Sequence, residues 1–281
     1  YFIWTNDYKD FDQLSNRLII TKRMRDNKDL LLKFLPSYID SLGKESLKFL
    51  DLRLLCGLPY MNCSYSSMKD KEKLRGSIHS FIRKNSSSNP LLEIHNELKN
   101  NNSQKDSDVQ KRVILILHEK ITNNHAMYRC YAHVIKELGE TFNIIGACMS
   151  SKYIDEVSIK LFNKHFVLDN ESILQTSEQL ANLIKQTNPD FIYLPSVGMD
   201  PFIVFISSFK LAKFQIYSLG HPGLIYSNTM DICVCLEGSK VTELDPNVKY
   251  SHISRNDVKT YRIFPEIAPK TNWNYLLKIS N

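Results

Sequence analysis

The sequence is poor in glycine, with nine in 281 residues, and none of them forms a glycine-rich phosphate-binding loop. Neither the G-x-G-x-x-G fingerprint of dinucleotide-binding folds nor the G-x-x-x-x-G-K-[ST] P-loop occurs. The G-x-S-x-G nucleophile elbow and a metal-binding His-x-x-x-His pair are missing as well. These absences argue against a nicotinamide dehydrogenase, a P-loop nucleotidase and a serine hydrolase of the α/β type.

Long apolar runs and paired cysteines are also missing. No stretch approaches the roughly 20 apolar residues that cross a bilayer, and the first residues do not form a signal peptide. The six cysteines have no C-x-x-C spacing, which favours reduced thiols in the cytoplasm: Cys56, Cys63, Cys130, Cys148, Cys233 and Cys235. The sequence therefore predicts a cytoplasmic protein without membrane insertion and without a bound metal.

The charge is modest and evenly spread. Thirty-six Lys and Arg residues against 30 Asp and Glu residues leave a formal charge of +6, with no sustained basic block. Such a balance tolerates anionic ligands but does not predict a nucleic-acid partner. With 43% hydrophobic and 23% charged residues, the chain has the composition of an ordinary folded protein.

The first hundred residues have helical patterns. Leu74, Ile78, Phe81 and Ile82 recur at helical spacing and predict a helix over Lys71–Lys84. A polar run at residues 100–108 has the composition of a linker. We therefore expect an all-α domain over residues 1–108.

Beyond that run, short apolar strands alternate with helices. Val113–Leu117 is a continuous apolar segment, typical of a parallel strand buried on both faces. Further strands are expected at 142–147, 166–168, 191–194, 214–218 and 232–236, and helices at 126–138, 172–186 and 200–211. This alternation predicts a doubly wound parallel sheet, an α/β lobe over residues 109–260.

Ligands of such sheets bind outside the carboxyl ends of the strands, where three loops carry polar residues. His125 lies at a helix N-terminus, as a cap or as a neutral base. Pro195–Asp200 forms a tight turn in which Asp200 caps the next helix, or in which backbone N–H groups face a ligand. His221, between Gly220 and Pro222, contacts a ligand or has a structural role.

Five segments resemble one protein family. Tyr193–Asp200 and Ser218–Pro222 are the strongest, and Asn124–Arg129, Phe34–Asp40 and Tyr60–Tyr65 support them. Together they are similar to the bacterial cytoplasmic N-glycosyltransferases that modify high-molecular-weight adhesins. These enzymes belong to glycosyltransferase family 41, which also holds the nucleocytoplasmic O-GlcNAc transferases.

The resemblance implies an all-α domain followed by the first Rossmann-like lobe of a two-lobed GT-B glycosyltransferase. It implies inverting transfer of a hexose, glucose by preference, from a UDP-sugar to Asn in Asn-x-Ser/Thr sequons of an adhesin-like polypeptide, without a metal cofactor. His125 and His221 correspond to histidines of the family's cleft and are the predicted catalytic residues. The predicted substrate-binding residues are Asn124, Tyr128, Arg129, Ser196, Gly198, Met199, Asp200, Gly220 and Pro222.

The sequence also departs from this family. Tyr226 stands where the family has a second histidine, and Lys120–Thr122 replace a histidine-rich run. The first residue is not Met, and the chain ends near the expected start of the donor lobe, with residues 261–281 as a connection towards it. We therefore expect a fragment that is inactive alone. The alternative is a non-catalytic adaptor or partner subunit that binds acceptors.

Overall fold

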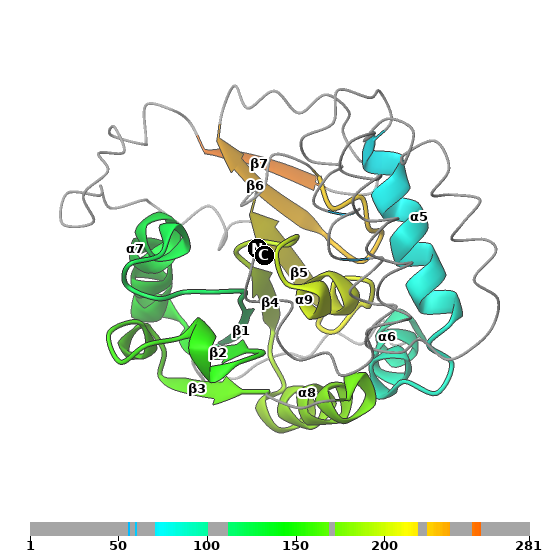
Figure 1. The fold of residues 1–281 in the computed structure, drawn as a ribbon, viewed down its shortest axis with the longest axis horizontal. Helices are drawn as coiled ribbons and strands as arrows, with labels where there is room; N and C mark the ends of the chain where they lie inside the picture. Colours follow the sequence, from blue (N-terminus) through cyan, green and yellow to red (C-terminus); the bar gives the residue numbers. More distant parts are fainter. Residues whose placement is uncertain are drawn as a thin grey trace, which may run out of the picture.

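In the computed structural model, the central element is a seven-stranded parallel sheet in the order β3-β2-β1-β4-β5-β6-β7 (Figure 1). The structure describes Cys56, Tyr60 and residues 71–100, 112–168, 172–218, 224–236 and 249–253. The strands are β1 (Val113–Leu117), β2 (Asn143–Cys148), β3 (Lys164–Val167), β4 (Phe191–Leu194), β5 (Phe214–Ser218), β6 (Ile232–Leu236) and β7 (Lys249–Ile253). Every strand pair is parallel, so the predicted doubly wound α/β sheet is confirmed.

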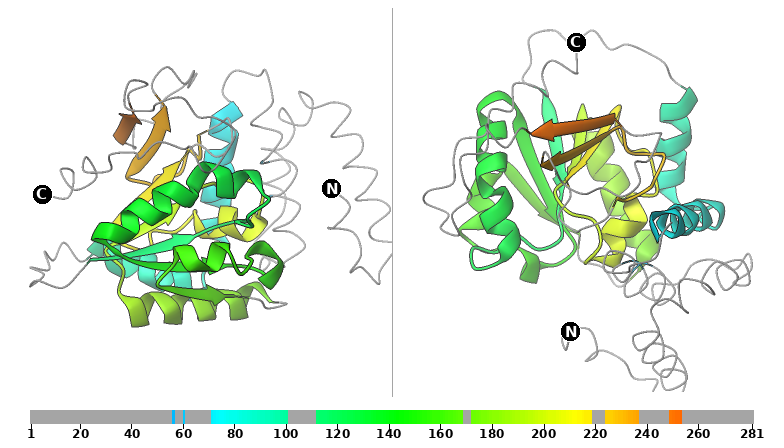
Figure 2. Two further views of the ribbon diagram at one scale, coloured as in Figure 1. Left: turned by 90° about the vertical axis from the view of Figure 1, so that its left-hand side faces the viewer. Right: turned by 90° about the horizontal axis from the view of Figure 1, so that it is seen from above.

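Helices cover both faces of this sheet. Helix α7 (Ala126–Thr141) lies on one face and packs against the short 3-10 helix η3 (Ser158–Leu161), while the 3-10 helix η2 (Ser151–Tyr153) follows β2. Helices α8 (Ile173–Thr187) and α9 (Pro201–Ile206) cover the other. Figure 2 shows the strands between α7 on one side and the remaining helices on the other. The burial follows the strand period, because Ile114 and Ile116 pack under α7 while Leu115 and Leu117 pack under α8 and α9.

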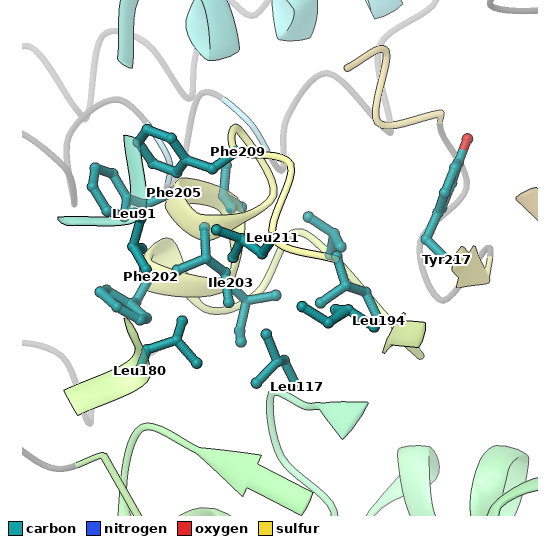
Figure 3. Close-up of a cluster of buried hydrophobic side chains, with 14 of the residues drawn as sticks. Leu91, Leu117, Leu180, Leu194, Phe202, Ile203, Phe205, Phe209, Leu211 and Tyr217 are labelled. Atoms are coloured by element: carbon teal, nitrogen blue, oxygen red, sulfur yellow. The ribbon is translucent and has the colours of Figure 1, made fainter. Parts of the chain in front are cut away.

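The larger core lies on the α8–α9 face. All six residues of α9, Pro-Phe-Ile-Val-Phe-Ile, are buried, which explains why this helix has no polar side. Figure 3 shows Phe202, Ile203 and Phe205 of α9 among leucines of the strands and of α8. The continuous apolar sequence of β4 is buried on both faces in the same way.

Two helices precede the sheet in the described part of the chain, α5 (Lys71–Lys84) and α6 (Pro90–Asn100). Helix α5 has the predicted bounds, and Leu74, Ile78 and Ile82 are buried as expected. Helix α6 was not predicted. Both helices share the buried cluster of α8 and α9, and α6 packs directly against α8. The proposed domain boundary at residue 108 stays a prediction.

Some predicted elements differ from the structure. Helix α9 ends at Ile206 instead of residue 211, because the chain continues in i to i+3 turns in which the Ser207 hydroxyl donates to the carbonyl of Val204. Strand β7 was missed, since Lys-Tyr-Ser-His-Ile lacks a continuous apolar run. The segments Phe34–Asp40 and, apart from Tyr60, Tyr60–Tyr65 lie outside the described residues, as does most of the predicted all-α domain.

Candidate functional site

The strand order reverses between β1 and β4, which lie side by side although two strands separate them in the chain. Ligands of doubly wound folds bind in the crevice that opens at such a reversal, outside the carboxyl ends of the strands. The loop that carries His125 follows β1, and the Pro195–Asp200 loop follows β4. The structure therefore brings these two predicted loops to the same position. Strand β5 is next to β4, but Gly220, His221 and Pro222 lie outside the described residues.

A buried glutamate joins the two loops. Glu119 comes directly after β1, and its Oε1 accepts hydrogen bonds from the backbone N–H groups of Gly198, Met199 and Asp200 at 2.8, 2.6 and 2.9 Å. Its Oε2 accepts a bond from the Ser196 hydroxyl at 2.7 Å. Burial raises the pKa of Glu119, and the four donors oppose that shift by favouring the carboxylate. No role was predicted for Glu119.

These contacts determine what the β4–α9 loop offers to a ligand. Four of its donors already bind the Glu119 carboxylate, an anion supplied by the chain itself. Gly198 has φ of 150°, which a side chain rarely adopts, and this conformation aims consecutive N–H groups at one oxygen. Asp200 caps α9 as predicted, because its Oδ1 accepts from the N–H groups of Phe202 and Ile203. The loop is built around an internal anion.

His125 is the N-cap of α7. Its Nδ1 accepts a hydrogen bond of 3.3 Å from the backbone N–H of Met127, so the capping interpretation is confirmed. Burial, and secondarily the nearby Lys120, lowers the pKa of this half-buried imidazole. A neutral ring whose Nδ1 accepts carries its hydrogen on Nε2. In this tautomer Nδ1 is engaged at the start of α7, and Nε2–H is the group that can donate, with the backbone of Lys120 as a nearby acceptor.

The remaining predicted residues of this loop differ in exposure. Asn124 and Arg129 are exposed, and the guanidinium of Arg129 donates to the Asn124 carbonyl at 3.2 Å. The Asn124 side chain accepts a bond from the Thr122 hydroxyl at 3.0 Å. Tyr128 is half-buried and packs against the core on the α7 face. Asn124 and Arg129 are therefore accessible from solvent.

Helix α5 holds the segment that follows the His221 loop. The Arg75 guanidinium is buried and donates to the carbonyl oxygens of Leu224 at 2.7 Å and Tyr60 at 3.1 Å. His79 bridges the Tyr60 hydroxyl at 3.1 Å and the Ser208 hydroxyl at 2.8 Å. These contacts connect α5 to two segments of the α/β part of the chain: Ser208, just after α9, and Leu224, which follows β5. The sequence contained no local signal for the contacts of Arg75 with Leu224 and of His79 with Ser208, since these partners are 149 and 129 residues apart.

Tyr226, a departure from the resembled family, packs on the same helix. A Cβ atom on Gly76 would lie only 3.0 Å from the Tyr226 ring and 3.1 Å from its carbonyl oxygen. Tyr226 also has φ of 58°, an uncommon conformation for a residue with a side chain. The absence of a side chain at Gly76 thus permits the close approach of the Tyr226 backbone.

Among the described residues, three metal-ligating side chains converge beside this site. His118, Cys148 and His165 each place a ligand atom within 4.8 Å of the others. The sequence analysis predicted no metal site, because these residues are far apart in the chain and follow no zinc-ligand spacing. Their proximity arises from the pairing of β1, β2 and β3.

None of the helices in the described part of the chain is long and apolar enough to cross a membrane.

Comparisons with known proteins agree with the resemblance drawn from the sequence. Residues 10–85 match the family described as HMW1 domain 2. A UDP-glucose:protein N-beta-glucosyltransferase of Actinobacillus pleuropneumoniae serotype 5b (strain L20) is 23% identical over 227 residues, which is 78% of this chain and 34% of that protein. The enzyme of the same name from serotype 7 (strain AP76) is 24% identical over 224 residues, again 78% of this chain and 34% of that protein.

Among solved structures, a Thermobaculum terrenum O-GlcNAc transferase mutant matches with a TM-score of 0.44 and 14% identity, over 75% of this chain and 38% of that one. The chain spans about a third of the length of the curated relatives it matches. The resemblance to the adhesin-modifying glycosyltransferases is confirmed: this chain is similar, over most of its own length, to bacterial UDP-glucose:protein N-glucosyltransferases.

Proposed function

We propose that this chain is part of an inverting protein glycosyltransferase that moves glucose from UDP-glucose to Asn in Asn-x-Ser/Thr sequons of adhesin-type polypeptides. The observation that carries the proposal is the match of 78% of the chain to two proteins named UDP-glucose:protein N-beta-glucosyltransferase. The proposal includes a cytoplasmic location and a transfer step that needs no metal ion.

The site geometry supports a division of labour between the two loops. The β4–α9 loop is filled by the Glu119 carboxylate, so we assign it the role of a rigid wall. The β1–α7 loop presents the exposed Asn124 and Arg129 and the Nε2 side of His125. We assign to His125 the positioning of the acceptor or donor sugar through a donated hydrogen bond, and to His221 the orientation of the sugar or its phosphates.

Charge stabilisation of the departing UDP is the part of the reaction that we assign to other residues of the full protein. Developing charge on a leaving group is a large term in such transfers, and it is stabilised by prearranged donors and cations. In the described part of the chain, the donors of the β4–α9 loop are already used by Glu119. We therefore propose that residues 1–281 alone do not catalyse transfer.

The test measures the mass of a peptide after incubation with the full protein and UDP-glucose. A peptide with an Asn-x-Thr sequon should gain one hexose, and a matched peptide with Gln in place of Asn should not. His221→Ala should abolish the gain, whereas Asn228→Ala, at an exposed position of the turn that follows, should retain it. Full activity of His221→Ala would show that the site assignment is wrong.

The adaptor alternative makes a different prediction in the same assay. An adaptor would bind the sequon peptide, as fluorescence anisotropy can measure, but the peptide would never gain mass with any UDP-hexose. That result from the full protein would overturn the enzymatic proposal.

A further inference from the structure

Three adjacent strands place His118, Cys148 and His165 on one face of the sheet. Strand β1 pairs in register with β2, so that Ile116 is opposite Gly146 and Leu117 is opposite Ala147. His118 extends this register by one residue, and its N–H donates to the Ala147 carbonyl at 3.0 Å, which brings His118 beside Cys148. On the next strand His165 is opposite Gly146. Because side chains alternate along a strand, all three point towards the α7 face.

Gly146 creates the space in which these side chains meet. A Cβ atom there would lie 2.5 Å from the Phe162 ring and 2.6 Å from the His165 ring. Both distances are shorter than the contacts that Cβ atoms make in proteins. The rings instead pack over the glycine, and Phe162 stacks on His118 with centroids 5.5 Å apart. The cluster therefore has an apolar wall and a floor without a side chain.

We propose that His118, Cys148 and His165 bind one zinc ion, with water as the fourth ligand. Two nitrogens and one sulfur are ligands that zinc prefers, and three protein ligands with one open position form a common tetrahedral arrangement. The ligand atoms lie within 4.8 Å of one another, and the two Nε2 atoms are 2.8 Å apart. Ligand atoms about 2.0–2.3 Å from zinc are roughly 3.3–3.6 Å apart in a tetrahedron. Binding thus requires the two rings to separate by about half an ångström.

The surroundings favour the required protonation states. His118 and Cys148 are fully buried and His165 is partly exposed. Burial lowers the pKa of His118 to about 3 and that of His165 to about 4, so both imidazoles are neutral near pH 7 and keep a lone pair. The Cys148 thiol now donates to the Ser150 carbonyl at 3.3 Å, and zinc binding would release its proton to solvent.

The site is separate from the proposed transfer reaction and does not rest on it. The ion would connect β1, β2 and β3 at the edge of the sheet, one residue before Glu119 in the chain. The ion would hold the start of the β1–α7 loop, and its water ligand would leave one coordination position open.

Metal binding can be measured directly on the full protein. The protein is stripped with a chelator, reloaded with excess zinc and dialysed, and its zinc content is then determined by mass spectrometry of the metal. In a second sample of the stripped protein, Co²⁺ is titrated as a spectroscopic probe. We expect one additional equivalent of zinc relative to Cys148→Ala, and a thiolate-to-cobalt charge-transfer band in the near ultraviolet. Cys148→Ala should lose the band, and His165→Ala should bind zinc at least about 100-fold more weakly, since loss of even an outer contact costs 10–100-fold.

Matched controls use residues of the same types on α7. Cys130 is exposed and His133 is half-buried, so Cys130→Ser and His133→Ala should keep the wild-type zinc content and cobalt spectrum. Zinc should also raise the melting temperature of the wild type but not that of His165→Ala, whose partly exposed position makes a folded variant the expected result. Equal zinc content in wild type, Cys148→Ala and His165→Ala would overturn the proposal, as would a cobalt band that disappears only in Cys130→Ser.

Discussion

The loops after β1 and β4 follow neighbouring strands, yet their polar groups have opposite fates. In the β4–α9 loop, three backbone N–H groups and the Ser196 hydroxyl all bind Glu119. In the β1–α7 loop, Asn124 and Arg129 are exposed, and the His125 ring accepts a hydrogen bond of 3.3 Å at the start of α7. One loop thus uses its polar groups within the protein, and the other exposes polar side chains to solvent, on either side of the point where the sheet order reverses.

This difference shows why residue type alone is a poor guide to a site. The β4–α9 loop has the turn and the consecutive N–H groups of an anion-binding loop. Its anion is a glutamate from the loop opposite, so the same donors stabilise the fold. The polar groups available to a ligand are the exposed side chains of the β1–α7 loop, and not the donors of the β4–α9 loop that already bind Glu119.

The largest effect should follow removal of the internal anion. Glu119→Ala leaves four buried donors without an acceptor, and we expect the free energy of unfolding to fall by about 3 kcal/mol or more. Glu119→Gln keeps an oxygen for the three N–H groups and places its NH₂ at the Ser196 hydroxyl, which can accept. Its loss should be only about 1 kcal/mol. Urea unfolding measures both, and equal losses would contradict the view that the loop is built around this acceptor.

A second effect concerns His79 of α5, which bonds the Ser208 hydroxyl just after α9. Burial, together with Arg83 and Arg75, lowers the pKa of His79 to about 3, against about 6.5 in an unfolded chain. Between pH 6.5 and 3, His79 binds a proton in the unfolded state but stays neutral in the native state. The contribution of His79 is complete above pH 6.5 and falls by about 1.4 kcal/mol per pH unit as the pH drops. His79→Asn should lower stability at pH 7 and give a shallower decline between pH 6 and 4. Parallel curves would show that His79 does not titrate as described.

A smaller effect tests the backbone of the rigid loop. Gly198→Ala forces a side chain onto a residue with φ of 150° and should cost about 1–2 kcal/mol. Gly139→Ala is the control, because its Cβ in α7 would meet only Ile144, at an ordinary 3.8 Å, and alanine is the better helix former. The control should gain about 0.5–1 kcal/mol. Thermal unfolding of both variants should move in opposite directions.

The smallest effect on stability separates the two interpretations of His125. His125→Ala removes the N-cap of α7 and should cost about 0.5–1 kcal/mol, whereas His125→Asn restores a good cap and should cost little. If the imidazole positions a substrate, both variants of the full protein should lose at least about tenfold in sequon glucosylation. Wild-type glucosylation by His125→Asn would leave His125 with a capping role alone.

Continuous apolar patterns were the part of the structure that the sequence predicted best. β1, β4 and β6 have the predicted bounds, because strands buried on both faces need unbroken apolar residues. β5 also has the predicted bounds, although Gln215 interrupts its apolar residues. β2, β3, α7 and α8 differ by only a few residues at their ends. Helix α9 and strand β7 were predicted poorly, since serine hydroxyls shorten one and the other has mixed polarity. The roles of the predicted site residues stay predictions.

Local patterns in the sequence determined the alternating elements, the caps at His125 and Asp200, and the loops that follow β1 and β4, because each depends on residues close in the chain. Only the tertiary structure decided the partner of the β4–α9 loop, the attachment of α5 to Leu224, and the meeting of His118, Cys148 and His165. The residues that meet in these contacts are 17 to 149 positions apart. Their formation depends on strand order and register, which follow from the packing of the whole sheet and not from any one segment.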